Sequence, residues 1–300
     1  MAERIGFIGL GQMGRWMAHN ILAKGFDLTV SDIDATAVAA LTERGAKSAA
    51  TPAEVAERTD WILLSLPNAE IVQRVIFGET GLLAKARAGQ VVIDLGTTAY
   101  MATLEIGARL KERDIQFADA PVSGMESRAK DGTLTIMYGG DEAVFQEILP
   151  VFNAVGNLTL YMGELGCGQL TKLINQLLFN ISAAAIAEML PMAVKLGLDP
   201  EKVVSVVTSG TGRSFAAEFF GPRVLENNFR DGYALKNAYK DMVSAAEICA
   251  HKKIPLPMVH AATTTYQMAL AEGLGDEDKG AMIKVFERLL GVEFRKKKGT

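Results

Sequence analysis

The sequence predicts an α/β protein in which a doubly wound, mostly parallel sheet is followed by an all-helical domain. In the first half, short apolar runs alternate with helical stretches, and near residue 165 the strand-like runs stop. Strands that alternate with helices are typical of a parallel sheet with helices on both faces. The length of 300 residues also suits about two domains.

Individual segments of the first half support this architecture. The run 4–10 is apolar without alternation, as expected for a strand buried on both faces of a parallel sheet. Residues 14–25 are expected to form a helix that ends at Gly25, and residues 51–59 a helix with Thr51 as its N-cap. Further strands are expected at 27–32, 61–67, 89–96, 115–123 and 132–140.

The second half has helical patterns only. The change falls in the glycine-rich segment 162–166. We therefore predict a first domain at 1–164 and a second domain at 165–300, which is entered through one long helix. The expected helices are 166–196, 200–209, 213–227, 235–253, 257–273 and 278–290.

Composition argues against several classes of protein. The formal net charge of -4 gives no electrostatic reason to bind nucleic acid or an anionic membrane. The two cysteines, Cys167 and Cys249, are far apart and the three histidines are scattered, so we expect neither a disulfide framework nor a metal site. The N-terminus lacks the pattern of a signal peptide, and the most apolar long run, 180–198, is interrupted by charged residues and a proline. We expect a cytoplasmic protein without a membrane span.

A glycine-rich loop, GLGQMG, follows the first expected strand and opens the first expected helix. Gly9 suits a tight turn, Gly11 a close approach to a pyrophosphate, and Gly14 close packing of helix on strand. The N-terminus of the helix would offer free N–H groups to the phosphates. With an acid at the end of the second strand, this context predicts a Rossmann-type dinucleotide site. Its loop consists of Gly9, Leu10, Gly11, Gln12, Met13 and Gly14.

That acid, Asp32, predicts which cofactor binds. A carboxylate at this place accepts hydrogen bonds from a ribose 2′-OH and repels a 2′-phosphate. The surrounding segment SDIDA contains no arginine or lysine that would bind the phosphate. We therefore expect NAD, with NADP disfavoured.

Several separated motifs resemble those of the β-hydroxyacid dehydrogenase family, which includes 3-hydroxyisobutyrate dehydrogenase and 2-hydroxy-3-oxopropionate reductase. The resemblance covers essentially the whole chain and keeps the family order. It implies an NAD-dependent interconversion of a small β-hydroxy acid and its semialdehyde. The motifs are GFIGLGQMG at 6–14, LSLPN at 64–68, DLGTT at 94–98, DAPVSGMESRAKDGTLTIMYGG at 119–140, GCGQLTKLINQ at 166–176 and YKD at 239–241.

The resemblance implies two further cofactor loops, which contribute Leu66, Pro67 and Thr97. Their expected position at the carboxyl ends of strands, where open α/β sheets bind ligands, agrees with that role. The family usually has Ser or Thr where this chain has Gly96, which removes one possible hydroxyl contact and favours Thr97 as the ligand.

The segment PVSGM resembles the substrate loop of the family. By this resemblance, Ser123 and the backbone N–H groups near Gly124 would hold the carboxylate of the substrate. A hydroxyl group and consecutive N–H groups suit an anion. The family commonly has a second glycine where this chain has Met125, so this side chain would narrow the pocket or line it for an apolar substituent.

The resemblance also implies that Lys172 is the general acid/base. Hydride transfer between a hydroxy acid and nicotinamide needs a group that removes the hydroxyl proton or returns it. A buried lysine can serve, because desolvation disfavours its ammonium form. On a helix, Lys172, Asn175 and Gln176 share one face. Asn175 would orient the substrate, and Gln176 replaces the second Asn of many family members.

Lys240 and Asp241 match a Lys-Asp pair of the family on a helix of the second domain. The resemblance implies that Lys240 contacts both cofactor and substrate and that Asp241 helps to position it. It also implies a homodimer or homotetramer that assembles through the helical half.

Three alternatives stay open at this point. A related reductase would act on a bulkier or altered substrate, as Met125 and Gly96 suggest. A nucleotide-binding regulator would bind NAD without turnover, although the retained Lys172, Asn175 and Ser123 argue against it. A methyltransferase would place an adenosyl cofactor in the same glycine loop.

Overall fold

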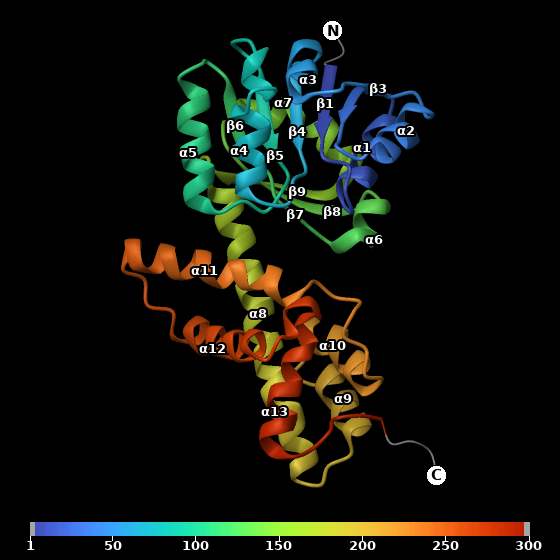
Figure 1. Cartoon of the computed structure of the whole chain (residues 1–300), viewed down its shortest axis with the longest axis vertical. Coiled ribbons are helices and arrows are strands. Elements are labelled where there is room, and N and C mark those ends of the chain that lie inside the picture. The colour runs from blue at the N-terminus through green and yellow to red at the C-terminus, as the bar shows by residue number, and fades with distance from the viewer. Residues whose placement is uncertain (1–3, 297–300) are drawn as a thin grey trace. The chain divides into compact units, whose positions relative to one another are not determined.

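The computed structural model describes residues 4–296. The chain divides into two compact units between Lys172 and Leu173, inside one long helix (Figure 1). The domain limits expected from the sequence, 1–164 and 165–300, stay a prediction. Their outer ends, 1–3 and 297–300, lie outside the described residues.

In the described part of the first unit, a nine-stranded sheet has the order β3-β2-β1-β4-β5-β6-β8-β7, and β9 pairs with β8. Neighbouring strands from β3 to β6 are parallel, as expected for a doubly wound sheet. β8 then runs antiparallel to β6 and β7 and parallel to β9. The strands are β1 Arg4–Ile8, β2 Asp27–Ser31, β3 Lys47–Ser48, β4 Trp61–Leu64, β5 Val91–Asp94, β6 Gln116–Asp119, β7 Val122–Ser123, β8 Leu134–Gly139 and β9 Gly156–Gly163.

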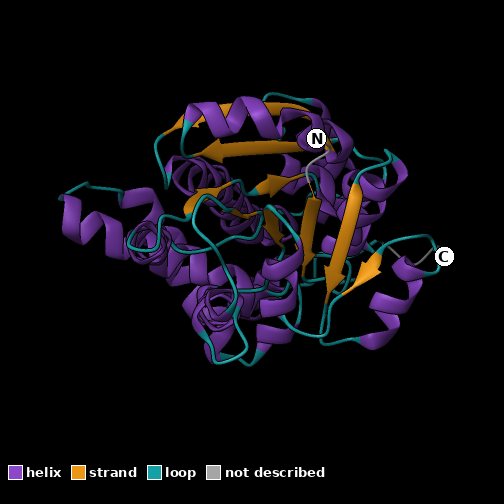
Figure 2. Ribbon diagram, turned by 90° about the horizontal axis from the view of Figure 1, so that it is seen from above, coloured by secondary structure: helices purple, strands orange, loops and turns teal. Residues whose placement is uncertain are grey.

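Helices flank these strands (Figure 2). Several begin at side chains that cap them: Thr51, Asn68 and Asp141 each accept a hydrogen bond from a backbone N–H of the first turn. The cap at Thr51 confirms the helix start expected there. The helices are α1 Gly14–Ala23, α2 Ala35–Thr42, α3 Pro52–Arg58, α4 Ala69–Phe77, the 3-10 helix η1 Leu82–Ala84, α5 Tyr100–Lys111, α6 Met125–Lys130 and α7 Glu142–Val155.

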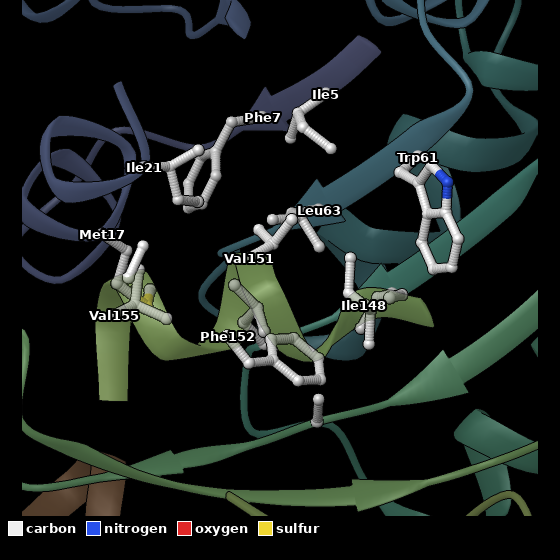
Figure 3. Close-up of a cluster of buried hydrophobic side chains, with 14 of the residues drawn as sticks. Ile5, Phe7, Met17, Ile21, Trp61, Leu63, Ile148, Val151, Phe152 and Val155 are labelled. Carbon is white, nitrogen blue, oxygen red and sulfur yellow. The ribbon is translucent and has the colours of Figure 1, made fainter. Parts of the chain in front are cut away.

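Both faces of the sheet are buried, because successive residues of a strand point to opposite sides. In β1, Phe7 belongs to one apolar cluster and Ile8 to another, and in β4 Leu63 and Leu64 divide in the same way. Figure 3 shows part of the first cluster, where side chains from α1 and α7 meet those of β1 and β4. The unbroken apolar run of the first strand follows from this double burial.

The sheet differs from the prediction in three places. The expected strand 115–123 is two strands, β6 and β7, because Pro121 lies between them and has no N–H to donate. The sequence analysis does not anticipate β9, whose residues are mostly exposed or half-buried and which follows α7 without a loop. β3 is also unanticipated and spans two residues.

The described residues of the second unit form helices around one apolar core. α8, Cys167–Lys195, begins in the first unit and then supplies Leu177, Ala184 and Leu190 to this core. The expected helix 278–290 is a short 3-10 helix followed by α13. The remaining helices are α9 Pro200–Ser209, α10 Phe215–Leu225, α11 Leu235–Lys252, α12 Pro257–Ala271, η2 Leu274–Asp276, η3 Lys279–Met282 and α13 Ile283–Leu290.

α8 is long and apolar enough to cross a membrane by length and composition alone, which the sequence analysis did not anticipate. Its most apolar window has a mean hydropathy of 1.7, and 44% of that window is buried inside the protein. A core helix of a soluble protein meets the same criterion. Length and hydropathy of one helix are therefore weak evidence for a membrane span.

Candidate active site

The loop between β1 and α1 has the geometry that a dinucleotide-binding loop needs. Gly9 has a φ of +98°, and a Cβ there would lie 2.3 Å from the carbonyl oxygen of Ser65. A Cβ on Gly14 would lie 1.9 Å from the carbonyl oxygen of Gly9. At Gly11, which is exposed, an added Cβ would meet no described atom within 4 Å. The first and third glycines thus permit the turn and its packing, and the second leaves backbone open to a ligand.

The N-terminus of α1 is suited to an anion. Among the described residues, no side chain caps this helix, and Met13 occupies its N-cap position. Leu10 is buried and holds the loop to the core, whereas Gln12 is exposed. Unpaired N–H groups and the positive end of the helix dipole favour a phosphate at such a place.

Asp32 follows β2 and is fixed beside the glycine loop. One carboxylate oxygen accepts a hydrogen bond from the backbone N–H of Leu10, and the other accepts one from Asp34 at 2.8 Å. The carboxylate stays partly accessible. Ile33 follows it and is fully exposed, so the position after the acid carries an apolar side chain where a cation would favour a 2′-phosphate.

The predicted cofactor residues Leu66, Pro67 and Thr97 follow β4 and β5, two neighbouring parallel strands. They therefore lie at the carboxyl edge of the sheet, where this class of fold binds ligands. A Cβ on Gly96 would lie 2.8 Å from the carbonyl oxygen of Leu66. The two loops approach so closely at Gly96 that a side chain there would push them apart.

Asp94, at the end of β5, holds the loop that contains Thr97. Its Oδ1 accepts a hydrogen bond from the Gly96 N–H at 2.8 Å, and its Oδ2 accepts one from the Thr98 hydroxyl at 2.5 Å. Asp94 is fully buried. The backbone around Thr97 is thus set by a carboxylate beneath it.

Asp119, at the end of β6, fixes the start of α8. It is fully buried, and its two carboxylate oxygens accept hydrogen bonds from the N–H groups of Gly166 and Gln169, each at 2.6 Å. Burial raises the pKa of Asp119 to about 7; the two N–H donors oppose this rise, and the charge of Asp94 adds to it. The first N–H groups of a helix have no acceptor within the helix, and the carboxyl group of Asp119 supplies one for those of Gly166 and Gln169.

Gln169 connects the first turn of α8 to the loop after β5. Its Nε2 donates to the Gly96 carbonyl at 2.9 Å, and its Oε1 accepts from the Thr98 N–H at 3.2 Å. A Cβ on Gly168 would lie 2.2 Å from the Met137 carbonyl oxygen, so the helix start packs directly on β8. The first turn of α8 is therefore held from several sides within the first unit.

Lys172 lies one turn further along α8. Its side chain is buried, with 9% of the residue exposed, and its Nζ donates to the carbonyl oxygen of Val122 at 2.9 Å. Val122 directly precedes Ser123 and Gly124. The structure thus brings the lysine expected to carry the proton to the loop expected to hold the carboxylate.

This loop has an unusual backbone. Gly124 has a φ of +143° and Met125 a φ of +61°, which is uncommon for a residue with a side chain. The left-handed conformation at position 125 explains why a glycine suits this place. The Met125 side chain is 46% exposed, so it is available to contact a ligand at the loop.

Asn175 and Gln176 follow Lys172 along α8 and belong to the second unit. Asn175 is exposed and Gln176 half-buried. The Nδ2 of Asn175 lies 3.4 Å from the Oε1 of Gln176, which is a long and weak hydrogen bond. Their contact with a substrate at Ser123 stays a prediction.

Lys240 and Asp241 lie on α11 in the second unit. Lys240 is half-buried, whereas Asp241 is 4% exposed. Burial raises the pKa of Tyr233 and of Tyr266, and the charge of Asp241 raises both further. Asp241 is therefore a buried acid near two phenols, and the roles expected for the pair stay a prediction.

The sequence analysis missed the buried carboxylates that position this site, Asp94 and Asp119, and the amide of Gln169. A signal for the two acids was available, because each directly follows apolar residues within an expected strand. Burial of an acid at such a position is costly unless it has partners, so the acid needs hydrogen-bond donors from nearby groups. The partners themselves come from segments about 50 residues away for Asp119, which spacing alone does not reveal.

Comparison with known proteins agrees with this geometry. Residues 4–163 match the family model described as the NAD binding domain of 6-phosphogluconate dehydrogenase. Residues 166–286 match the one described as NAD-binding of NADP-dependent 3-hydroxyisobutyrate dehydrogenase. The chain belongs to the β-hydroxyacid dehydrogenase family. It is an NAD(P)-dependent oxidoreductase of that family, with the expected fold class of a mostly parallel sheet followed by a helical domain.

Individual relatives match the chain over nearly its whole length. A 2-(hydroxymethyl)glutarate dehydrogenase from Eubacterium barkeri is 39% identical, over 96% of each chain. A 2-hydroxy-3-oxopropionate reductase from Escherichia coli is 33% identical, over 95% of this chain and 97% of the relative. The crystal structure of 3-hydroxyisobutyrate dehydrogenase from Salmonella typhimurium is 31% identical with a TM-score of 0.84, and covers 95% of this chain and 100% of its own.

Proposed function

We propose that this member of the β-hydroxyacid dehydrogenase family is an NAD-dependent enzyme that interconverts a small β-hydroxy acid and its semialdehyde, with Lys172 as general acid/base. One observation carries the proposal. The buried Nζ of Lys172 is hydrogen-bonded to the Val122 carbonyl, directly before the Ser123–Gly124 loop. A proton carrier and a carboxylate-binding loop next to each other are what the reaction needs.

The residues at the carboxyl edge of the sheet fit a bound dinucleotide. Gly11 leaves space for the pyrophosphate, and α1 lacks a side-chain cap. The partly accessible Asp32 carboxylate is able to accept hydrogen bonds from a ribose. When bound, the nicotinamide accepts the hydride from the carbinol carbon or returns it to the aldehyde. Leu66, Pro67 and Thr97 would border it from the neighbouring loops.

The protein's own groups do the remaining work. During oxidation, neutral Lys172 would take the proton from the substrate hydroxyl; during reduction, its ammonium would give a proton to the oxygen that gains charge. The Ser123 hydroxyl and the Gly124 N–H would bind the carboxylate and orient the carbinol carbon. By resemblance to the family, Asn175, Gln176, Lys240 and Asp241 would also contribute to substrate binding.

We further propose NAD over NADP. Asp32 would meet a 2′-phosphate with like charge, and Ile33 offers no compensating cation. We also propose a cytoplasmic homodimer or homotetramer whose ligand is a small carboxylate, with no nucleic-acid or membrane partner. The net charge of -4 supports the last point.

A second candidate substrate class is a β-hydroxy acid with a larger substituent. The name of the Eubacterium barkeri relative specifies such a compound, a hydroxymethyl group on glutarate. In this chain, Met125 presents a flexible, half-exposed side chain at the substrate loop. A methionine there would accommodate a longer carbon chain by apolar contact.

A substrate panel tests the proposal and separates the two classes. We expect the purified enzyme to turn over at least one of 3-hydroxyisobutyrate, glycerate, 3-hydroxypropionate, threonate and 2-(hydroxymethyl)glutarate with NAD. The ratios of kcat/KM among them decide between a small and a larger substrate, and Met125→Gly should change these ratios. NADH binding without turnover of any acid would instead support a non-catalytic NAD-binding protein.

A further inference from the structure

α6 packs against α1 (Figure 1), and the side chain of Glu126 joins α6 to the start of α1. Its Oε2 accepts a hydrogen bond from the Gln12 Nε2 at 2.8 Å, and its Oε1 accepts one from the Trp16 Nε1 at 2.9 Å. The guanidinium of Arg15 donates to the same Oε1. These three donors come from the glycine loop and from the first turn of the helix that follows it.

The three donors keep Glu126 ionised. Hydrogen bonds from Trp16, Arg15 and Gln12, in this order of effect, lower the pKa of Glu126 to about 2. The side chain is nevertheless 33% exposed, and exposed ion pairs contribute little to overall stability. The arrangement therefore has more to do with local geometry than with the stability of the fold.

A second contact ties the other end of α6 to α1. The Nδ2 of Asn20 donates to the Ala129 carbonyl at 2.9 Å, and Ala129 is buried. Because α6 spans only Met125–Lys130, these contacts hold both its first and its last turn to α1. Both ends of the short helix are therefore attached to the helix that follows the glycine loop.

The residue before Glu126 needs such support. Met125 has a φ of +61°, an unfavourable conformation for a side chain, and the preceding Gly124 provides no side-chain cap for α6. Conformations of this kind persist only where surrounding contacts fix them. The bonds of Glu126 lie directly next to this strained backbone and to Ser123–Gly124.

We propose, on the basis of the proposed function, that Glu126 is a positioning residue that couples the cofactor loop to the substrate loop. Gln12 and Glu126 form the direct link between the two loops. A cofactor that orders residues 9–14 would also order residues 122–131 through this link. Cofactor binding would thereby raise the affinity for the carboxylate substrate.

Hydrogen exchange with and without NADH tests this coupling without knowledge of the substrate. In the wild-type enzyme, NADH should slow amide exchange in both 9–14 and 122–131. In Glu126→Gln, an NH2 group replaces one of the two acceptor oxygens. It faces groups that are themselves donors, so the contact between Glu126 and α1 weakens. NADH should then protect 9–14 as before and protect 122–131 much less.

Matched variants keep the result interpretable. Glu57→Gln removes a comparable exposed ion pair, with Lys85, away from both loops, and should behave as the wild type. Trp16→Phe keeps an aromatic ring at this place and removes the Nε1–H donor to Glu126. It should show a smaller loss of coupling, and it provides a test even if Glu126→Gln folds poorly. With the best acid of the substrate panel, Glu126→Gln should raise KM about fivefold or more and leave kcat within about twofold.

The outcomes are distinct. If NADH protects 122–131 equally in the wild type, in Glu126→Gln and in Trp16→Phe, the coupling is overturned and the proposed function is left intact. Absence of NADH protection at 9–14 in the wild type would overturn the proposed function, and the coupling with it. A fall in kcat with unchanged KM in Glu126→Gln would also overturn a positioning role.

Discussion

The side chain of Lys172 is buried, and its Nζ donates a hydrogen bond to the backbone carbonyl of Val122. An ammonium group in such surroundings is poorly hydrated, so its free energy depends strongly on whether a partner group is near. The proton-carrying role proposed for it uses this sensitivity.

Replacement of Lys172 tests that role. Lys172→Ala should lower kcat about a hundredfold or more, because the proton transfer loses its general acid/base. NADH binding, measured by fluorescence titration, should stay within a few-fold of the wild type. Lys85→Ala, which removes an exposed lysine of the same unit, is the control. A kcat near that of the wild type for Lys172→Ala would exclude this residue as the proton carrier.

The residues expected to touch a ligand were easier to predict than those that hold the surrounding loops in place. Gly9, Gly14 and Asp32 have the geometry expected from their motif, because the motif itself encodes the turn, the close packing and the strand end. Asp119 and Gln169 act through contacts between distant segments. One sequence carries no direct information about such pairs.

At the scale of elements, the start of α8 depends on a buried carboxyl group. The raised pKa of Asp119 means that the folded protein binds its proton more tightly than the unfolded chain, whose ordinary value is 3.8. The stability that this group contributes is therefore present below the unfolded pKa. It falls as the pH rises from about 4 to about 7.

Urea unfolding of the wild type and Asp119→Asn checks this sign. The free energy of unfolding of the wild type should decrease relative to the variant between about pH 4 and pH 7, by at most about 1.4 kcal/mol per pH unit. Both tryptophans, Trp16 and Trp61, lie in the first unit, so tryptophan fluorescence reports the unit that contains Asp119. Parallel pH profiles for the two proteins would contradict the raised pKa.

Elements of the sheet show where pattern reasoning works and where it does not. β1 and β4 are apolar on both faces and are predicted well. β9 lies beside β8 and is largely exposed or half-buried, so it lacks the continuous apolar run that identifies the inner strands. The break between β6 and β7 depends on a proline inside an otherwise strand-like run, which the pattern alone reads as continuous.

At the scale of the whole molecule, cofactor choice should appear as a difference in stability. A ligand that binds only the folded state stabilises it by about 2.7 kcal/mol at a concentration of 100 times its Kd. At equal concentrations, NADH should therefore raise the Tm of the wild type more than NADPH does. Asp32→Ala should narrow the difference, because the repulsion of the 2′-phosphate is lost.

A matched control lies at the other end of β2. Asp27→Ala removes a half-buried acid, which begins β2 and pairs with Lys47, and should leave the difference between NADH and NADPH unchanged. Equal Tm shifts with both cofactors in the wild type would contradict the preference for NAD. Tm is the right measurement, because it needs no substrate.

The left-handed backbone at Met125 restricts which side chains mutation is able to place in the loop proposed to bind the substrate. β-branched side chains are the least tolerated at such a φ, and glycine and asparagine the most. A library of all amino acids at this position would therefore lose valine, isoleucine and threonine to misfolding before selection acts on substrate. Substitutions that keep this backbone conformation are therefore those that lengthen, shorten or remove an unbranched side chain.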